Sequence, residues 1–202
     1  MTAITATTQL DAVNIMLSHQ GEEPYNSLVG ETNAEVRSAV LVLDEILKET
    51  CSMGWLFNSE EDVVLTLNAD SEIDVPATAV NITFPRHAKR KYTTRRNKLY
   101  NRDTLSHTFT DSVKVNLIRL MDFEDLPEVC RKYVTVKAGR VYQGRYLASE
   151  TVDKFTERSE YEALTDLKEQ ESVERDANIL DSPDVHAGVL GGRNGGVIRG
   201  AY

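Results

Sequence analysis

The feature that most constrains this fold is a strand that leads into a long helix, within residues 113–147. Apolar and polar side chains alternate over residues 113–120, which is typical of a half-buried β-strand. An acidic corner at residues 122–125 then precedes Pro127, and proline is favoured at the first position of a helix because the N–H group it lacks would have no partner there. Two apolar stripes predict a helix from Pro127 to about Leu147 that is buried on more than one side. We therefore expect this helix to lie at the centre of the fold.

Two further helices are predicted before this unit. The first carries apolar side chains at helical spacing, with Thr7 or Thr8 placed to cap its first turn. The second follows Asn33, another favourable capping residue, and keeps apolar positions three or four residues apart until Gly54 ends it. We expect Trp55 to enter the core after that turn as an aromatic anchor.

Short, broken apolar runs between residues 58 and 123 indicate strands. We expect strands at residues 63–67, 73–75, 80–84 and 105–109, and a β-hairpin at residues 91–100. A structureless loop of that length would be unusual in a compact domain. These segments therefore predict a small antiparallel sheet inserted between two pairs of helices.

A fourth helix is predicted from Ser149 to about Ala177, and its polar end from Lys168 onward is expected to project into solvent or onto a neighbour. The predicted fold class is α+β: a four-helix bundle of two N-terminal and two C-terminal helices, with an inserted small antiparallel β-sheet and an extended C-terminal tail. We expect three segments: a helical bundle of residues 1–57 and 124–178, an inserted β region of residues 58–123 with a basic hairpin, and a glycine-rich C-terminal arm of residues 179–202.

Composition sets limits on function. The chain has 202 residues, 41% of them hydrophobic, and a formal net charge of −9. It is long enough for one domain with an elaborated insertion, and its acidic balance argues against a general nucleic-acid binder, which is usually basic. The first residues lack the basic and apolar regions of a signal peptide, and no apolar run reaches transmembrane length. We therefore expect a soluble protein with no membrane partner.

The predicted hairpin carries a high density of positive charge, with Tyr92 and Tyr100 interleaved. We interpret it as a partner-contact surface, for an acidic protein surface or for DNA phosphates. The alternative is a solvated hairpin whose charges offset the acidic remainder of the chain. The candidate contact residues are Arg86, Lys89, Arg90, Lys91, Arg95, Arg96, Lys98 and Arg102.

Glycine recurs in the last stretch of the chain, where it occurs in pairs. This stretch has too few apolar residues to fold alone, yet more than a linker needs. We therefore expect an assembly arm that orders on a partner. Its candidate anchors are Val189, Leu190, Val197, Ile198 and Tyr202.

No pattern indicates a catalytic, cofactor-binding or metal site. Cys51 and Cys130 lack metal-ligand spacing, and none of the four histidines lies four residues from another. The carboxylates of the acidic corner could serve a glycosidase, but a cluster stabilised by the dipole at a helix start is far more common. The sequence contains no P-loop, dinucleotide or nucleophile-elbow fingerprint. We therefore expect no catalytic residue, no cofactor and no metal ligand.

Three ordered segments of the sequence resemble the tail tubular protein A family, the head-to-tail adaptors of short-tailed bacteriophages. The segments are residues 12–24, residues 54–58, and residues 113–123 with the following Leu126-Pro127-Glu128 and Lys137-Ala138. The resemblance covers most of the chain up to about Tyr146 and includes a matching length. It is more specific than any short motif in the sequence.

This resemblance implies a virion protein of the phage tail, made in the host cytoplasm, and not an enzyme. Members of the family form a twelve-subunit ring that contacts the portal protein on one side and the nozzle protein, tail tubular protein B, on the other. Tail fibre protein attaches near the lower junction, and DNA passes through the lumen without sequence-specific binding. Two alternatives remain: a tail-associated hydrolase acting on cell-envelope polysaccharide, and a small DNA-binding protein working through residues 89–102.

Overall fold

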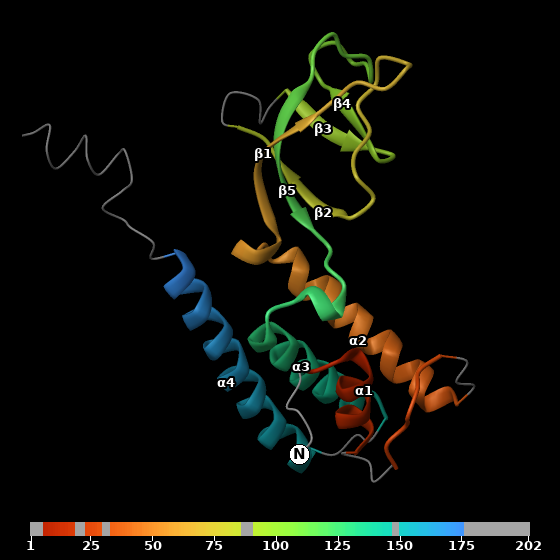
Figure 1. Cartoon of the computed structure of the whole chain (residues 1–202), viewed down its shortest axis with the longest axis vertical. Helices are drawn as coiled ribbons and strands as arrows, with labels where there is room; N and C mark the ends of the chain where they lie inside the picture. Colours follow the sequence, from red (N-terminus) through yellow and green to blue (C-terminus); the bar gives the residue numbers. More distant parts are fainter. Residues whose placement is uncertain (1–5, 19–22, 30–32, 86–90, 147–149, 176–202) are drawn as a thin grey trace, which may run out of the picture.

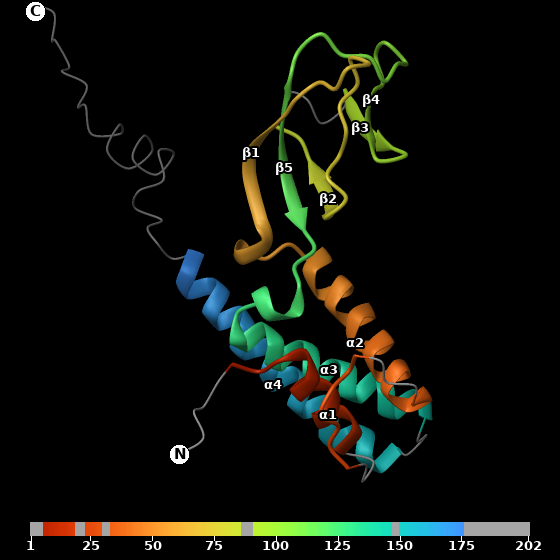
Figure 2. The same ribbon diagram turned by 45° about the vertical axis from the view of Figure 1, so that its right-hand side comes forward.

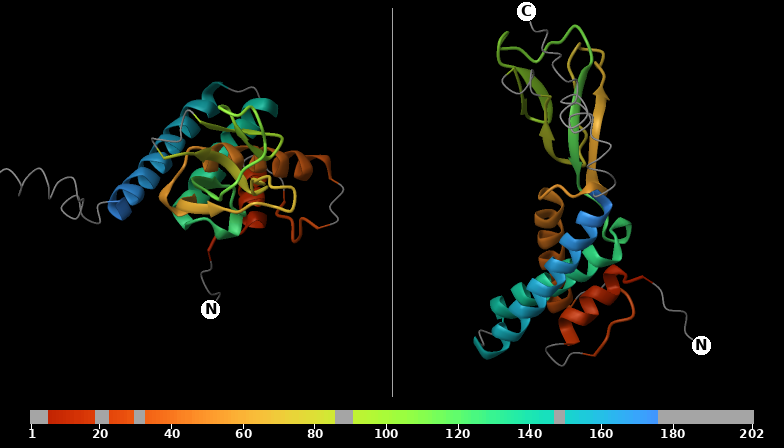
Figure 3. Two further views of the ribbon diagram at one scale, coloured as in Figure 1. Left: turned by 90° about the horizontal axis from the view of Figure 1, so that it is seen from above. Right: turned by 90° about the vertical axis from the view of Figure 1, so that its left-hand side faces the viewer.

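The computed structural model describes residues 6–18, 23–29, 33–85, 91–146 and 150–175, without the side chains between residues 146 and 156. Within these residues the molecule is elongated, with four helices at one end and the strands at the other (Figure 1). The right-hand view in Figure 3 shows the strands at one end of the long axis and the helices at the other. The elements in chain order are α1 Gln9–Ser18, α2 Ala34–Ser52, η1 Leu56–Asn58, β1 Ser59–Leu65, β2 Ala79–Thr83, β3 Tyr92–Arg95, β4 Lys98–Asn101, β5 Val113–Arg119, η2 Phe123–Asp125, α3 Glu128–Tyr146 and α4 Glu150–Arg175. The predicted α+β class is confirmed.

Helix α3 is the centre of the helical end, as predicted, because it packs against α1, α2 and α4 (Figure 2). Tyr133, Val134, Ala138 and Tyr142 on this helix are each at most 1% exposed. They share one hydrophobic cluster with buried residues of the other three helices. Val141, for which the helical pattern predicts burial like that of Val134, is only half-buried and packs against this cluster from outside. None of the described helices combines the length and apolarity that a membrane span requires.

Side-chain caps fix the starts of α1 and α2. The Thr8 hydroxyl accepts a hydrogen bond from Asp11 N at 3.2 Å, and Asp11 Oδ2 accepts one from Thr8 N at 3.0 Å. The Thr8 hydroxyl also donates to Asp11 Oδ2, and this bond together with the backbone bond lowers the pKa of Asp11. Asn33 Oδ1 accepts from Glu35 N at 2.8 Å. Of the two residues predicted to cap α1, Thr8 is therefore the one that does so, and the predicted cap of α2 is confirmed.

The acidic corner and the start of α3 hold the chain segment that leads into α1. Glu124 Oε1 accepts a hydrogen bond from Gln9 N at 3.1 Å, and Glu128 Oε2 accepts one from Thr7 N at 3.0 Å. Arg131 donates to the carbonyl oxygen of Thr7 at 2.9 Å. These bonds satisfy backbone groups at a helix start that would otherwise lack partners.

The strands form two small sheets instead of the one sheet that was predicted. Strands β1, β5 and β2 make an antiparallel sheet in the order β1-β5-β2, and β3 and β4 make a separate hairpin. The hairpin and the strands near residues 63–67, 80–84 and 113–120 confirm four of the predicted elements. Residues 73–75 and 105–109 were wrongly predicted as strands, because they pair only through isolated bridges. Pro76 follows the first segment, and a positive φ of 52° at Leu105 turns the backbone in the second.

A second hydrophobic cluster fills the β region. Val115 and Leu117 of β5 project into it and are at most 1% exposed, as the alternation predicts. Ile73 and Leu99 contribute fully buried side chains from outside this sheet. The bridged segment around residue 73 therefore belongs to the core although it is not a strand.

The two ends of the molecule meet at η1. Trp55, the predicted aromatic anchor, is 7% exposed, stacks with Phe57, and donates its indole N–H to Thr50 O at 2.8 Å. Glu171, in the polar end of α4, accepts a hydrogen bond from Leu56 N at 3.0 Å. The polar end of α4 was predicted to project into solvent or onto a neighbour, but this carboxylate ties it to η1 of the same chain.

Candidate interaction surfaces

The basic hairpin is the first candidate surface. Strands β3 and β4 pair in register from Tyr92↔Asn101 to Arg95↔Lys98, so only Arg96 and Asn97 form the turn. Both turn residues have positive φ, 52° and 57°, which defines the type I′ geometry that matches the twist of a hairpin. The turn exposes the Arg95 and Arg96 side chains at the tip of the hairpin.

The two tyrosines of the hairpin serve as platforms for its cations. The Arg95 guanidinium lies 3.9 Å from the centroid of the Tyr100 ring, and Lys91 Nζ lies 5.5 Å from that of Tyr92. Such contacts hold the stems of the side chains while the charges stay in water. The interleaving of tyrosine and basic residues in the sequence therefore has a structural basis.

The remaining described cations of the hairpin differ in their surroundings. Lys98 forms an ion pair with Glu72, and the hydrogen bond that Lys98 donates to the Glu72 carboxylate raises the pKa of Lys98. Its charge is therefore offset within the chain. Arg102 is exposed and lies at the mouth of a groove beside the hairpin. The other predicted contact residues, Arg86, Lys89 and Arg90, lie outside the described part of the chain, as do the arm residues Val189, Leu190, Val197, Ile198 and Tyr202.

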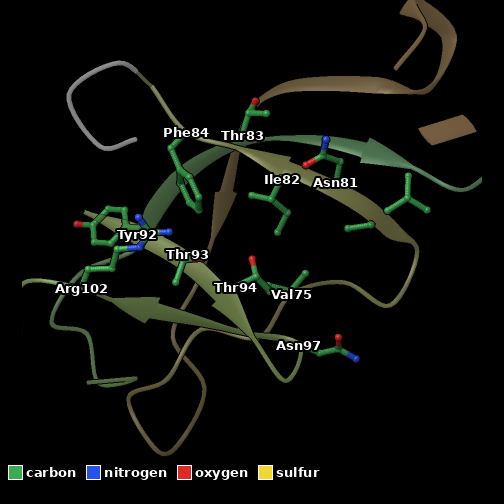
Figure 4. Close-up of a pocket in the computed structure, with 12 residues that line it drawn as sticks. Val75, Asn81, Ile82, Thr83, Phe84, Tyr92, Thr93, Thr94, Asn97 and Arg102 are labelled. Carbon is green, nitrogen blue, oxygen red and sulfur yellow. The ribbon is translucent and has the colours of Figure 1, made fainter. Parts of the chain in front are cut away.

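The groove is the second candidate surface, and sequence reasoning missed it. It has a volume of about 500 Å³ and runs between β2 and β3 (Figure 4). Phe84 and Tyr92 lie together at one end, with ring centroids 5.8 Å apart, and Asn81 and Asn97 lie near the other. The sequence contains one indication that β2 and β3 do not pair with each other. It is the break between the predicted strand at residues 80–84 and the predicted hairpin at residues 91–100.

Cys51, Cys130 and His107 carry side chains that could take part in catalysis, but each of them packs against other residues of the fold. Burial raises the pKa of Cys51, and it raises the pKa of Cys130 to about 12, so both thiols stay neutral and poorly nucleophilic at ordinary pH. His107 Nδ1 lies 2.9 Å from Leu99 O, and its ring packs edge-on against Tyr100. Among the described residues no three His, Cys, Asp or Glu side chains come together as a metal site would require.

Among the described residues, these features are typical of a protein that contacts a partner. The described surfaces offer a charged hairpin and an open groove, and the buried thiols are held in their unreactive form.

Comparison with known proteins gives the family. The family model described as tail tubular protein matches residues 10–177, most of the chain. Tail tubular protein A of Klebsiella phage KP34 is 32% identical to it over 129 residues, which are 62% of this chain and 66% of that relative. The match thus spans just under two thirds of the relative's length. The chain belongs to the tail tubular protein family. It is accordingly a structural component of the virion tail and not an enzyme, and the hydrolase alternative gains no support.

Proposed function

We propose that the chain is a head-to-tail adaptor of a short phage tail. In this role it forms a ring, most simply of twelve copies, between the portal protein and the nozzle protein, tail tubular protein B. Tail fibre protein attaches near the lower junction. The observation that carries the proposal is the family match over residues 10–177.

The shape of the chain suits an adaptor. A closed ring uses two different faces of each copy in head-to-tail contacts, and it leaves its two ends for two different partners. The two ends of this elongated molecule are built from different elements, helices at one end and strands at the other. We assign the scaffold to residues 1–57 and 124–178, partner contact to the inserted residues 58–123, and assembly to the arm of residues 179–202.

Charge fits the passage of DNA through such a ring. Twelve copies with a net charge of −9 each would carry about −108 formal charges. A lumen that shares this sign repels phosphates, so the duplex slides through without sequence-specific binding. A positively charged lumen would retain the DNA, so the basic hairpin lies outside the lumen in this proposal. There it contacts an acidic protein partner.

Imaging of reconstituted complexes tests the proposal. The purified chain is mixed with the portal protein of the same phage, and then with its nozzle protein, and the particles are imaged by electron microscopy. We expect a ring of density on the portal that is required for the nozzle to join. A nozzle that joins the portal equally well without this chain would contradict the adaptor role.

A further inference from the structure

Two unpaired strand edges face each other across the groove. Among the described residues, β2 is the edge of the three-stranded sheet, and β3 pairs only with β4. An edge strand offers a row of backbone N–H and C=O groups that another extended chain can pair with. The groove between these two edges is therefore a template for an added strand (Figure 4).

The direction of one backbone group in the groove follows from the hydrogen bonds of the hairpin. Leu99 N donates to Ile73 O at 2.9 Å, so this N–H points away from β3. Its partner in the register is Thr94, which therefore occupies a non-hydrogen-bonded position of the β3–β4 ladder. The N–H of Thr94 consequently points away from β4, and Thr94 lines the groove.

The side chains of the groove suit a strand with one apolar face. Ile82, Phe84 and Tyr92 are at least half-buried in the β cluster and give the groove an apolar floor. Asn81 and Thr94 are exposed along its edges. Strand addition of this kind draws affinity from main-chain hydrogen bonds and selectivity from alternate side chains.

We propose that the C-terminal arm of one copy, within residues 176–202, inserts into this groove on a second copy as an added strand. The arm carries two adjacent apolar pairs: Val189-Leu190 lies between two glycines, and Val197-Ile198 lies between Gly196 and Arg199. Successive side chains of a strand point to opposite faces, so one member of a pair meets the apolar floor. This inference rests on the proposed ring, and it names where the arm docks.

The end of α4 explains why the groove belongs to a second copy. Glu171 accepts a hydrogen bond from Leu56 N, and η1 leads directly into β1, so α4 ends on the β1 side of the sheet. Strand β2 lies on the opposite side of β5 from β1 (Figures 1 and 2), and the groove is lined by β2 and β3. In a closed ring the opposite sides of adjacent copies face each other. The 27 residues after Arg175 span at most about 97 Å when fully extended, enough to bridge adjacent copies.

Disulfide trapping between two tagged variants tests the inference. One variant carries Asn81→Cys in the groove, and the other carries Val197→Cys or Val189→Cys in the arm. The two are mixed, assembled with the portal protein and oxidised. The native Cys51 and Cys130 are fully buried and leave the introduced thiols as the reactive ones. The matched control places the groove cysteine at exposed Glu61 on β1, the far edge of the same sheet.

We expect a mixed disulfide dimer between the Asn81→Cys variant and an arm variant. The yield of this dimer should be at least about five times lower when Glu61→Cys replaces Asn81→Cys. Assembled rings without this preference would overturn the inference and leave the adaptor role intact. A double variant carries Asn81→Cys and Val197→Cys in one chain. If it forms the disulfide within that chain while the mixed variants form none, the arm docks in its own groove, which would also overturn the inference. Failure to assemble with or without portal would overturn the adaptor role and the inference together.

A second variant tests the backbone pairing itself. Thr94→Pro removes the N–H that faces the groove and spares the bonds to β4, a change that edge strands tolerate. Thr94→Val keeps the N–H and the shape of the side chain. In the Asn81→Cys background, we expect Thr94→Pro to lower the yield of mixed dimer about five-fold relative to Thr94→Val, the effect of one lost backbone bond. Equal yields would contradict strand pairing.

Discussion

The side-chain amide of Asn58 donates a hydrogen bond to the main-chain carbonyl of Arg119 at 2.8 Å and so joins the helical end to β5. The same Nδ2 donates to Cys51 O at 2.8 Å, and Oδ1 accepts from Trp55 N at 2.8 Å. Asn58 is only 2% exposed. One buried amide therefore satisfies three backbone groups from the end of α2, η1 and β5.

Loss of this amide should destabilise the whole chain. Asn58→Ala removes the side-chain donor to Arg119 O and Cys51 O, of which Cys51 O keeps the bond from Gly54 N, and it removes the acceptor of Trp55 N. We expect a loss of about 3 kcal/mol in the free energy of unfolding. Asn58→Asp keeps the acceptor for Trp55 N but turns a carboxylate toward two carbonyl oxygens, so it should cost at least as much. Urea denaturation followed by circular dichroism measures both. A loss below about 0.5 kcal/mol for Asn58→Ala would show that the amide is not needed.

Gly54 should tolerate no side chain. It has a φ of +77°, and an added Cβ would lie 2.7 Å from Ile118 Cδ1. We expect Gly54→Ala to cost about 2 kcal/mol through the left-handed backbone and this clash. The matched control is Gly144→Ala within α3, where nothing lies within 4 Å and helix propensity should give a gain of up to about 1 kcal/mol. Equal thermal midpoints for the two variants would contradict this account.

The helical end of the fold is predictable because its signals are local in the sequence. The Asn33 cap, the turn at Gly54 and the apolar period of α3 each lie within a few residues of the structure they specify. The role of Asn58 is not predictable in this way. Its partner at Arg119 is 61 residues away, and an asparagine before a strand reads equally well as an ordinary turn residue.

Two valines of α3 should separate buried from half-buried positions. Val134 has no exposed surface, so Val134→Ala should cost about 1–3 kcal/mol through lost transfer energy and a partly relaxed cavity. Val141 is half-buried, and Val141→Ala should cost less than about 1 kcal/mol. Chemical denaturation of the two variants side by side measures the difference. A larger loss at Val141 would mean that the helices pack differently around α3.

Alkaline pH should destabilise the chain through Cys130. Burial raises the pKa of Cys130 from 9.0 to about 12 in the folded state, whereas the unfolded thiol keeps its ordinary pKa. Between these values the folded state holds a proton that the unfolded state has lost, so stability falls as pH rises above about 9. Cys130→Ala should make the free energy of unfolding fall less steeply between pH 8 and about pH 11. The same slope in both proteins would contradict a buried neutral thiol.

Charge reversal of the hairpin should separate docking from folding. Lys91, Arg95, Arg96 and Arg102 are exposed, so their reversal to Glu should cost under about 1 kcal/mol each. We expect weaker and slower docking to an acidic partner, and a loss that shrinks as salt rises. Biosensor binding to portal and nozzle proteins at two salt concentrations provides the measurement. The control reverses four exposed cations elsewhere: Arg37, Lys48, Lys114 and Lys168.

Either of two results would contradict the hairpin prediction. Unfolding of the reversed variant would show that these cations hold the hairpin together, for example through Arg95 over Tyr100. Normal docking at low salt would mean that the hairpin is only a solvated loop whose charge balances the acidic remainder.

The β end is only partly predictable from sequence. The hairpin has local signals, because alternating residues flank a short turn. Residues 73–75 and 105–109 have the composition of strands but form only isolated β-bridges. Composition does not encode whether a neighbouring strand lies close enough to form a longer ladder. The groove depends on the separation between β2 and β3, which tertiary packing sets. The tie between Glu171 and Leu56 spans 115 residues and has no local signal either.

The mass of the assembled particle tests the central claim most directly. A chain of 22.7 kDa that closes into a ring of twelve has a mass of about 272 kDa. Native mass spectrometry of the purified chain, alone and mixed with portal protein, should show this ring free or added to the portal. A chain that stays at 22.7 kDa in both samples would contradict the adaptor.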